Sequence, residues 1–505
     1  MIQSIWQSRK FNIKTSSNIL RKITSSQSII LKQSLSSTTA ATWPDKRETS
    51  YSSSSPHKNS INNNNNNNSN NNNHQPNQIT KRKITGGFRA FSRTDSNSMN
   101  KPLYTSKNIP GNFTLSPRLR KSPFFDKTIE HGVGEFTIYN RMLMPLYYKE
   151  GLDTEYKALT EDVAIWDVAA ERQVELRGPD AHKLAQFLTC RNISKIKSGK
   201  CVYAIMTDED GVVINDPVLL KLADDRFWFS IADSDAVLWA KGIAIGQNLD
   251  VKVFEPDVSP LALQGPKSKD LMCDLYGADV VNKLKYFDFT RGEHTKLLGK
   301  IPTLLARSGW SPELGYEIYL EDSYYGNELY DLICEHGKKY NMKPGCPNHQ
   351  RRIEGGMLSF GGDTLADTNA LELGLPKKFV NPYSEHDFIG KEALQRIMEE
   401  DGGPARQLYG IMFNKSVEDD NLQNLIQYWQ GKHLEVFEDN LAIAPIGTLT
   451  TFSPSSPKFD GHSLGFAFLD RTEHDHLNST IYVKTANDVL VEGTVCKLPF
   501  AKRTA

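Results

Sequence analysis

Residues 211–233 read GVVINDPVLLKLADDRFWFSIAD, and this stretch decides the fold class of the chain. Two apolar runs flank the acidic pair Asp224 and Asp225, a pattern typical of two β-strands joined by a turn. Upstream, residues 172–178 (RQVELRG) alternate polar and apolar side chains, as a half-buried strand does. Strands are therefore expected throughout this part of the chain.

Asp216 stands inside the first apolar run, where a carboxylate is costly unless it is paired or functional. Pro217 follows it and removes a backbone donor, which indicates a bulge or a strand end that opens into a cavity. The alternative is a plain turn, because Asn-Asp-Pro is also turn chemistry. We interpret Asp216 as a candidate functional residue.

Helical patterns surround these strands. Pro179 opens one predicted helix, because proline in a first turn loses no intrahelical hydrogen bond. Ser234 is placed to cap another. Further helices are predicted after Gly265-Pro266, over residues 326–340 and over residues 347–359.

The residue pattern of the sequence changes after Gly402-Gly403-Pro404. Five short strand-like runs follow, namely QLYGIMF, IGTLTTF, SLGFAFL, STIYVKT and LVEGTVCKL. Regularly spaced short strands are typical of small antiparallel barrels or sandwiches. The sequence thus predicts an α+β domain over residues 114–403 and a β-barrel domain over residues 404–505.

The first hundred residues differ from the rest. No acidic residue precedes Asp45, while Lys, Arg and Ser are frequent, as in mitochondrial transit peptides. Residues 1–45 are predicted to be such a peptide, which implies a mitochondrial matrix location; the alternative is a basic tail without a targeting role. Residues 46–113 include an almost pure Asn tract and are predicted to be disordered.

Composition excludes several classes of function. Across the 505 residues, Lys plus Arg and Asp plus Glu both number 60, so there is no basic excess for nucleic-acid binding. No apolar stretch reaches the ~18 residues that a membrane span needs. The six cysteines form no C-x-x-C pair, so we expect no metal site and infer a reducing compartment.

From Pro117 onward the sequence resembles the glycine-cleavage T-protein family of folate-binding transferases. The resemblance rests on eight segments that keep the family's order: IWDVAAERQVELRG, YAIMTDEDGVVINDPVLLKL, PLALQGPKS, ARSGWSPELGYEIYL, RRIEGGMLSFGGD, FIGKEAL, LGFAFLD and CKLPF. It implies three subdomains arranged in a ring, a central folate channel, and a small C-terminal β-barrel that closes one side. It also implies tetrahydrofolate as the co-substrate.

Within the family, the motifs are similar to those of the dimethylsulfoniopropionate demethylases. Ala169, Ala170, Glu171 and Arg172 follow the Asp of the first motif, where the glycine-cleavage enzyme usually has a Ser-His pair. TCR at 189–191, NDPV at 215–218 and PGCPN at 344–348 also match the demethylases. Relatives that demethylate aromatic ethers share some of these motifs. KSGKCVYA at 197–204 lacks the Gly-Gln-Glu of the iron–sulfur assembly relatives, which disfavours that branch.

The resemblance assigns roles to residues that already stand out. Glu317 and Tyr319 alternate along one strand and so share a face, and a carboxylate suits the paired N–H donors of a pterin. The family position of Glu317 is the pterin ligand; the alternative is a strand with polar side chains toward solvent. The resemblance makes Asp216 the catalytic residue beside the reactive nitrogens of the folate, with Tyr203 and Val218 flanking the pterin.

Arg352 matches the helix Arg of the family's folate channel, where it would serve the glutamate tail. The alternative is an ordinary surface ion pair with Glu354. Gly355 and Gly356 weaken a helix at this point by about 1 kcal/mol each, which indicates close approach to a ligand or a neighbouring backbone.

The predicted function is transfer of a methyl group from a small donor such as dimethylsulfoniopropionate to tetrahydrofolate. A sulfonium has no N–H to donate, so aromatic rings are its natural partners; the candidates are Trp310, Tyr286, Phe287, Phe289, Tyr139 and Tyr147. Two alternatives remain open. One is an aminomethyltransferase of glycine cleavage, which would add a lipoyl carrier protein as partner. The other is a non-catalytic folate-binding protein.

Overall fold

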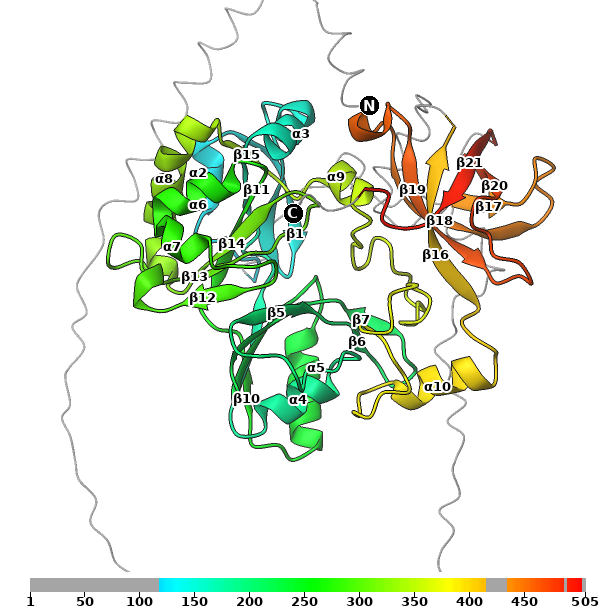
Figure 1. Ribbon diagram of the computed structural model, residues 1–505, viewed down its shortest axis with the longest axis horizontal. Helices are drawn as coiled ribbons and strands as arrows, with labels where there is room; N and C mark the ends of the chain where they lie inside the picture. The colour runs from blue at the N-terminus through cyan, green and yellow to red at the C-terminus, as the bar shows by residue number, and fades with distance from the viewer. Residues whose placement is uncertain (1–117, 415–433, 486–487, 502–505) are drawn as a thin grey trace, which may run out of the picture. The chain divides into compact units, whose positions relative to one another are not determined.

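The computed structural model describes residues 118–414, 434–485 and 488–501 (Figure 1). The predicted transit peptide and the Asn-rich segment lie outside the described residues. No helix within the described ranges has the length and apolar character that a membrane crossing requires.

A six-stranded sheet forms the first body, in the order β12–β13–β14–β11–β3–β15. Its strands are β3 Ala164–Asp167, β11 Ser259–Gln264, β12 Phe289–Arg291, β13 Thr303–Ala306, β14 Gly315–Leu320 and β15 Lys343–Gly345. Helices cover one face (Figure 1), namely α2 Phe125–Glu130, α6 Ser268–Tyr276, α7 Ala278–Val281 and α8 Gly326–Gly337. Every residue of β3, β11, β13 and β14 is buried, so both faces of the sheet are covered.

A five-stranded antiparallel sheet forms the second body, in the order β10–β4–β9–β8–β5. Its strands are β4 Gln173–Arg177, β5 Lys200–Tyr203, β8 Val218–Ala223, β9 Arg226–Ser230 and β10 Lys252–Phe254. Helices α4 Ala181–Phe187 and α5 Ala236–Gly246 pack on one face around a shared apolar cluster (Figure 1). The hairpin predicted around Asp224 and Asp225 is confirmed as β8–β9.

The strand break predicted at Asp216 and Pro217 is present. β7 (Val213–Asn215) ends before Asp216 and pairs with β6 (Met206–Thr207), while β8 begins at Val218. The predicted Ser234 cap is displaced by one position: Asp235 is the N-cap of α5, and the Ser234 hydroxyl accepts the Ala236 N–H at 3.3 Å.

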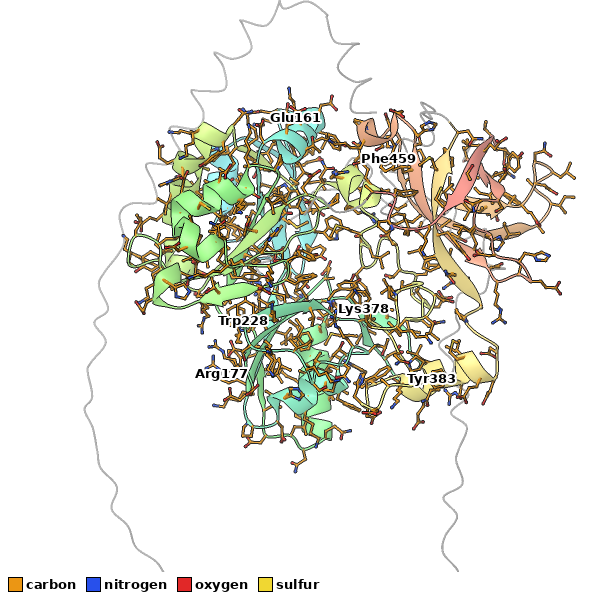
Figure 2. All side chains as sticks on the ribbon, in the orientation of Figure 1. Glu161, Arg177, Trp228, Lys378, Tyr383 and Phe459 are labelled. Carbon is orange, nitrogen blue, oxygen red and sulfur yellow. The ribbon has the colours of Figure 1, made fainter. Side chains whose placement is uncertain are left out.

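The two sheets contact each other through an apolar cluster. Trp228 of β9 lies 6.2 Å from Tyr319 of β14, ring centre to ring centre, and Cys201 and Leu304 join them. Figure 2 labels Trp228 at this junction. Residues on the facing strands are thereby brought close together although they are far apart in sequence.

A hairpin of β1 (Val133–Tyr139) and β2 (Met142–Tyr148) precedes α3 (Leu152–Glu161). Asn140 and Arg141 form its two-residue turn with positive φ of 48° and 59°, as such turns require. The Asn140 side chain donates to the Ala170 carbonyl at 2.9 Å and accepts the Ser234 N–H at 3.0 Å. The hairpin tip therefore ties the end of the first body to the second.

Two predicted helices differ in extent. The helix over residues 326–340 divides into α8 and a short 3-10 turn, η5 Lys338–Tyr340. The helix expected over residues 347–359 is only α9, His349–Glu354. Gly355 and Gly356 end it rather than lie within it, because Gly356 has a φ of 63° and its backbone approaches Pro499. The remaining short elements are η3 Glu293–Thr295, η4 Ser323–Tyr325, η6 Pro457–Phe459 and α10 Lys391–Glu399.

The C-terminal part is a closed barrel in the order β16–β19–β18–β17–β20–β21. The strands are β16 Arg406–Phe413, β17 Leu434–Phe437, β18 Pro445–Ser453, β19 Leu464–Asp470, β20 Thr480–Lys484 and β21 Leu490–Cys496. The barrel closes because β16 pairs with both β19 and β21. The α+β class and the barrel are as predicted, but the sequence reading missed β17, whose four residues (LEVF) are too few to show alternation.

Candidate functional site

Asp216, Tyr203 and Val218 lie together at the edge of the second sheet. Tyr203 pairs with Val218 across β5 and β8, and its hydroxyl donates to Asp216 Oδ2 at 2.9 Å. Burial raises the pKa of Asp216 to about 7; the Tyr203 hydrogen bond opposes this shift and the charge of Asp363 adds to it. A carboxyl with a pKa near neutral pH suits general acid–base chemistry.

Glu317 lies at the centre of β14 and is only 8% exposed. Its Oε2 accepts hydrogen bonds from the hydroxyl of Ser308 and from that of Tyr319, the latter at 3.0 Å. The predicted shared face of Glu317 and Tyr319 is therefore present. The alternative of a solvent-facing strand is wrong, since both side chains are buried.

Glu171 lies near both halves of this arrangement. Burial raises its pKa to about 8, and the charges of Glu317 and Asp216 contribute. The Tyr139 hydroxyl belongs to the same group, because its pKa is raised by burial and by the charges of Glu171 and Asp216. In the sequence, Glu171 was noted only as part of the motif that separates the branches of the family. An acidic residue directly after the two small apolar residues Ala169 and Ala170 was the signal that could have revealed it.

Arg352 is fully buried and makes no ion pair with Glu354, so the alternative of a surface pair is wrong. It pairs with Asp363, donates to Thr451 Oγ1 at 2.9 Å, and packs between the rings of Trp310 and Phe466 at 5.6 and 5.5 Å. Contact between this enclosed guanidinium and a folate tail remains a prediction.

Glu354 instead pairs with the neighbouring Arg351 at 2.5 Å. Arg351 also pairs with Glu313 at 2.6 Å. The two arginines of α9 therefore belong to separate ion-pair networks.

Asp363 connects Arg352 to the Asp216 pair. Its Oδ2 accepts from Arg352 and from the Ser359 N–H, the latter at 2.6 Å. Its Oδ1 is buried and has no hydrogen-bond partner among the described residues. The charge of Asp363 also raises the pKa of Asp216 and of Tyr203, so Asp363 lies within electrostatic reach of the pair.

Most of the aromatic residues that the sequence offered as partners of a sulfonium have other contacts than Asp216, Glu317 and Glu171. Trp310 donates to the Leu358 carbonyl at 2.9 Å and stacks on Arg352, and Phe289 belongs to the core between the two sheets. Tyr286 is 42% exposed. Tyr139 is the aromatic candidate that the structure brings to Glu171 and Asp216.

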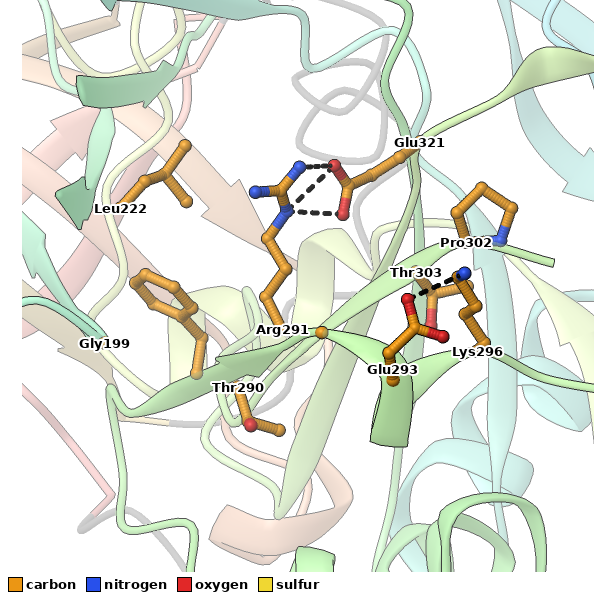
Figure 3. Close-up of a pocket in the computed structure, with 11 residues that line it drawn as sticks. Gly199, Leu222, Thr290, Arg291, Glu293, Lys296, Pro302, Thr303 and Glu321 are labelled. Carbon is orange, nitrogen blue, oxygen red and sulfur yellow. Dashed lines mark hydrogen bonds and ion pairs between the residues drawn. The ribbon is translucent and has the colours of Figure 1, made fainter. Parts of the chain in front are cut away.

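A separate polar pocket of about 530 Å³ lies beside β12 (Figure 3). Arg291 donates to Glu321 at 2.7 Å and Lys296 pairs with Glu293 at 2.8 Å, so each of these cations is neutralised. Of the residues that the sequence singled out, the pocket lining includes Phe289 but neither Asp216 nor Glu317. We therefore place the candidate site at Asp216, Glu317 and Glu171.

The chemistry of these groups suits an amine-bearing heterocycle. Buried carboxylates accept N–H donors, and Glu317 together with the unpartnered Oδ1 of Asp363 provides such acceptors. Asp216 can balance a positive charge that develops on an amine. A reduced folate fits this set of acceptors.

Known proteins share sequence and fold with this chain. The model of the GCVT N-terminal domain matches residues 124–381. A dimethylsulfoniopropionate demethylase of Ruegeria pomeroyi is 39% identical over 302 residues, which cover 60% of this chain and 80% of that protein. An aminomethyltransferase of Thermoanaerobacter pseudethanolicus is 27% identical over 380 residues, covering 74% and 95%.

Among solved structures, the glycine cleavage system aminomethyltransferase T of Bartonella henselae superposes with a TM-score of 0.63 at 20% identity, covering 76% of this chain and 99% of that one. This likeness bears on the fold.

Proposed function

The chain belongs to the GCVT family of glycine-cleavage T proteins, and from that premise we propose that it transfers a methyl group from a small donor such as dimethylsulfoniopropionate to tetrahydrofolate. The observation that carries the proposal is the degree of similarity to the demethylase, 39% identity, against 27% to the aminomethyltransferase. The Ala169-Ala170-Glu171 sequence, in place of a Ser-His pair, supports the same choice.

Glu317, Asp216 and the residues beside them have proposed tasks. Bound tetrahydrofolate would supply the amine that accepts the one-carbon unit. Glu317 would accept the N–H donors of the pterin, with Tyr203 and Val218 beside it. Asp216 would orient the amine and offset its developing positive charge. Arg352 would hold Asp363 in place.

Transfer from a sulfonium asks little acid–base work of the protein, because the charge on sulfur already activates the methyl group. The carbon–sulfur bond breaks, a neutral thioether leaves, and Asp216 accepts the proton that the amine loses. The remaining tasks are alignment of sulfur, carbon and nitrogen and exclusion of water, and alignment alone contributes several kcal/mol. The buried surroundings of Asp216 and Glu317 suit both tasks.

The alternative is an aminomethyltransferase. It is supported by the similarity to the Thermoanaerobacter pseudethanolicus aminomethyltransferase, which covers 95% of that protein. That reaction would use a lipoyl carrier protein as partner and require Asp216 to take part in proton transfer as ammonia leaves. In either case the chain is an enzyme, and Asp216 argues against a folate-binding protein without activity. Incubation with tetrahydrofolate and each donor distinguishes the two, because one yields 5-methyl- and the other 5,10-methylene-tetrahydrofolate.

Replacement of Glu317 by glutamine should weaken tetrahydrofolate binding by about 1–3 kcal/mol, the range for a charge-assisted hydrogen bond. Calorimetric titration measures the change. Glu321→Gln is a matched control, since Glu321 lies just beyond the same strand but pairs with Arg291 in the separate pocket. Equal affinities for the wild type and Glu317→Gln would remove the pterin assignment.

We also propose a mitochondrial matrix location, on the strength of the acid-free, basic leader. A fluorescent protein fused after residue 45 should enter mitochondria. The same fusion with Arg9, Lys10 and Arg21 changed to glutamate should remain in the cytosol. Diffuse fluorescence from the unaltered leader would contradict the proposal.

A further inference from the structure

The polar pocket beside β12 lies at the far ends of two strands that carry the candidate site (Figure 3). β5 and β8 reach Asp216 at Tyr203 and Val218. Their other ends supply Gly199 and Leu222 to the pocket lining. The volume of about 530 Å³ lies within the range of small-molecule sites. A ligand in this pocket is therefore bound apart from the proposed folate.

Hydrogen bonds hold the lining of the pocket in place. The Phe289 N–H of β12 donates to the Gly199 carbonyl at 2.9 Å, which joins the edges of the two sheets. Directly after β12, the Gly292 N–H donates to Thr295 Oγ1 at 3.1 Å and sets the turn that leads to Lys296. Binding to a lining that already has its final shape loses little free energy to ordering of the chain.

Arg291 presents a fixed guanidinium to the pocket. Its Nε donates to the two carboxylate oxygens of Glu321 at 2.7 and 2.9 Å, and its Nη2 donates to the same carboxylate. The group also lies over the ring of Trp228, 6.0 Å from the ring centre. The orientation of the guanidinium is therefore set by the protein before any ligand arrives.

One edge of this guanidinium has no protein partner. Nη1 has no acceptor among the residues that the structure describes, and Figure 3 shows it directed away from Glu321. Glu175, whose charge also acts on Arg291, already accepts from Arg226 at 2.7 Å and from Trp228 at 2.8 Å. The free Nη1–Nη2 edge has the geometry to hold a carboxylate by two parallel hydrogen bonds.

Lys296 adds a second positive charge to the same pocket. Its partner Glu293 lies three residues before it, and the Glu293 side chain is 87% exposed. Such an exposed ion pair is weak because water screens it. The Lys296 ammonium can therefore exchange Glu293 for an anion in the pocket at little cost.

Apolar side chains complete the lining, namely those of Leu222, Phe289 and Pro302. Phe289 is buried in the cluster between the two sheets, so its ring has a fixed place. The lining carboxylates offer little to a cationic ligand, because Glu321 is taken by Arg291 and Glu293 faces solvent. Free donors beside an apolar wall suit a ligand with an anionic end and an apolar end.

We propose that this pocket binds a small organic anion, a carboxylate that carries a short apolar group. The carboxylate pairs with the Nη1–Nη2 edge of Arg291 and with the Lys296 ammonium. The apolar group lies against Leu222 and Phe289. Because Leu222 belongs to the second sheet and the other three residues to the first body, the bound anion contacts both sheets at their junction.

The test uses phenylacetate as the probe, because it combines a carboxylate with one apolar ring. Calorimetric titration of the full chain should give a dissociation constant of about 1 mM or lower. The same constant is expected with and without tetrahydrofolate. Phenylacetamide, which keeps the shape but not the charge, and acetate, which lacks the ring, should each bind at least about tenfold more weakly.

Variants assign the binding to the pocket. Arg291→Lys keeps an ion pair with Glu321 but offers no second edge, so affinity for phenylacetate should fall about tenfold or more. Lys296→Met, in an exposed turn, should weaken binding about threefold or more. Lys300→Met is the matched control: it breaks an exposed pair with Glu328 outside the pocket lining and should bind phenylacetate as the wild type does.

Several results would overturn the inference: no saturable binding of phenylacetate up to about 10 mM, equal affinity for phenylacetamide, displacement of the probe by tetrahydrofolate, or unchanged affinity in Arg291→Lys. Melting curves check that each variant is folded. If Arg291→Lys does not fold, Lys296→Met decides alone, and wild-type affinity in that variant rules out the site.

Discussion

Asp216→Asn should lower the rate of methyl transfer in a single turnover by about 10²-fold or more, the scale for loss of a preorganised charge or acid–base group. The variant should fold normally, because asparagine has nearly the shape of aspartate. Tetrahydrofolate affinity should fall less than the rate does if the carboxylate acts mainly in the transition state. Paired rate and binding measurements on the two proteins give both quantities.

The pH dependence of this variant follows from the environment of Asp216. Burial raises its pKa from 3.8 to about 7, so the folded protein favours the protonated form and loses stability as pH rises from about 4 to 7. Asp216→Asn removes that loss, and its melting temperature above pH 7 should equal or exceed that of the wild type. The rate of the wild type should rise through pH 7 as the carboxylate ionises, and the variant should lack this step.

Tyr203→Phe tests the pKa of Asp216 by a second route. The Tyr203 hydroxyl donates to Asp216 and lowers its pKa, so removal of this hydrogen bond should move the midpoint of the rate profile to higher pH.

A wild-type rate in Asp216→Asn would contradict the mechanism. A collapsed melting curve would instead show that Asp216 is a structural residue.

Arg352→Met should destabilise the fold by about 3–5 kcal/mol, because it leaves Asp363 as a buried charge without its partner. Thr451 and the rings of Trp310 and Phe466 lose their contacts with the guanidinium as well. The midpoint of urea unfolding, followed by far-UV circular dichroism, measures the loss.

Matched variants identify the cause. Lys338→Met breaks an exposed pair with Glu335, and such pairs contribute at most about 1 kcal/mol. The double variant Arg352→Met with Asp363→Asn removes both charges and should recover part of the loss. If Arg352→Met and Lys338→Met shift the midpoint equally, the buried pair has no special weight.

Local features of the sequence carried most of the correct predictions. Alternation along residues 315–320 placed Glu317 and Tyr319 on one face, and the proline after Asp216 marked the strand break, because both effects act within a few residues. The length of α9 was overestimated because the apolar pattern does not show that Gly356 must adopt a positive φ against Pro499.

What the sequence could not show is the choice of partners over long distances. Arg352 stands close to Glu354 in the sequence, but side chains two residues apart on a helix do not face each other. Its partners are Asp363 and a barrel threonine 99 residues away. The electrostatic environment of Glu171 is set partly by Glu317 and Asp216, which the packing of two sheets brings near it. These partners are determined by tertiary contacts, which a local sequence pattern does not contain.

The buried contacts of α9 also bear on how the chain can be divided. The C-terminal segment returns to this helix: the Ala501 N–H donates to the Glu354 carbonyl at 2.8 Å, and the Ser456 hydroxyl donates to the Glu354 carboxylate. A fragment that stops at residue 403 would lose these donors, the Thr451 acceptor and the Phe466 ring that packs on the Arg352 guanidinium. These contacts join the barrel to the α+β part, and expression of the α+β half alone is expected to give an unstable product.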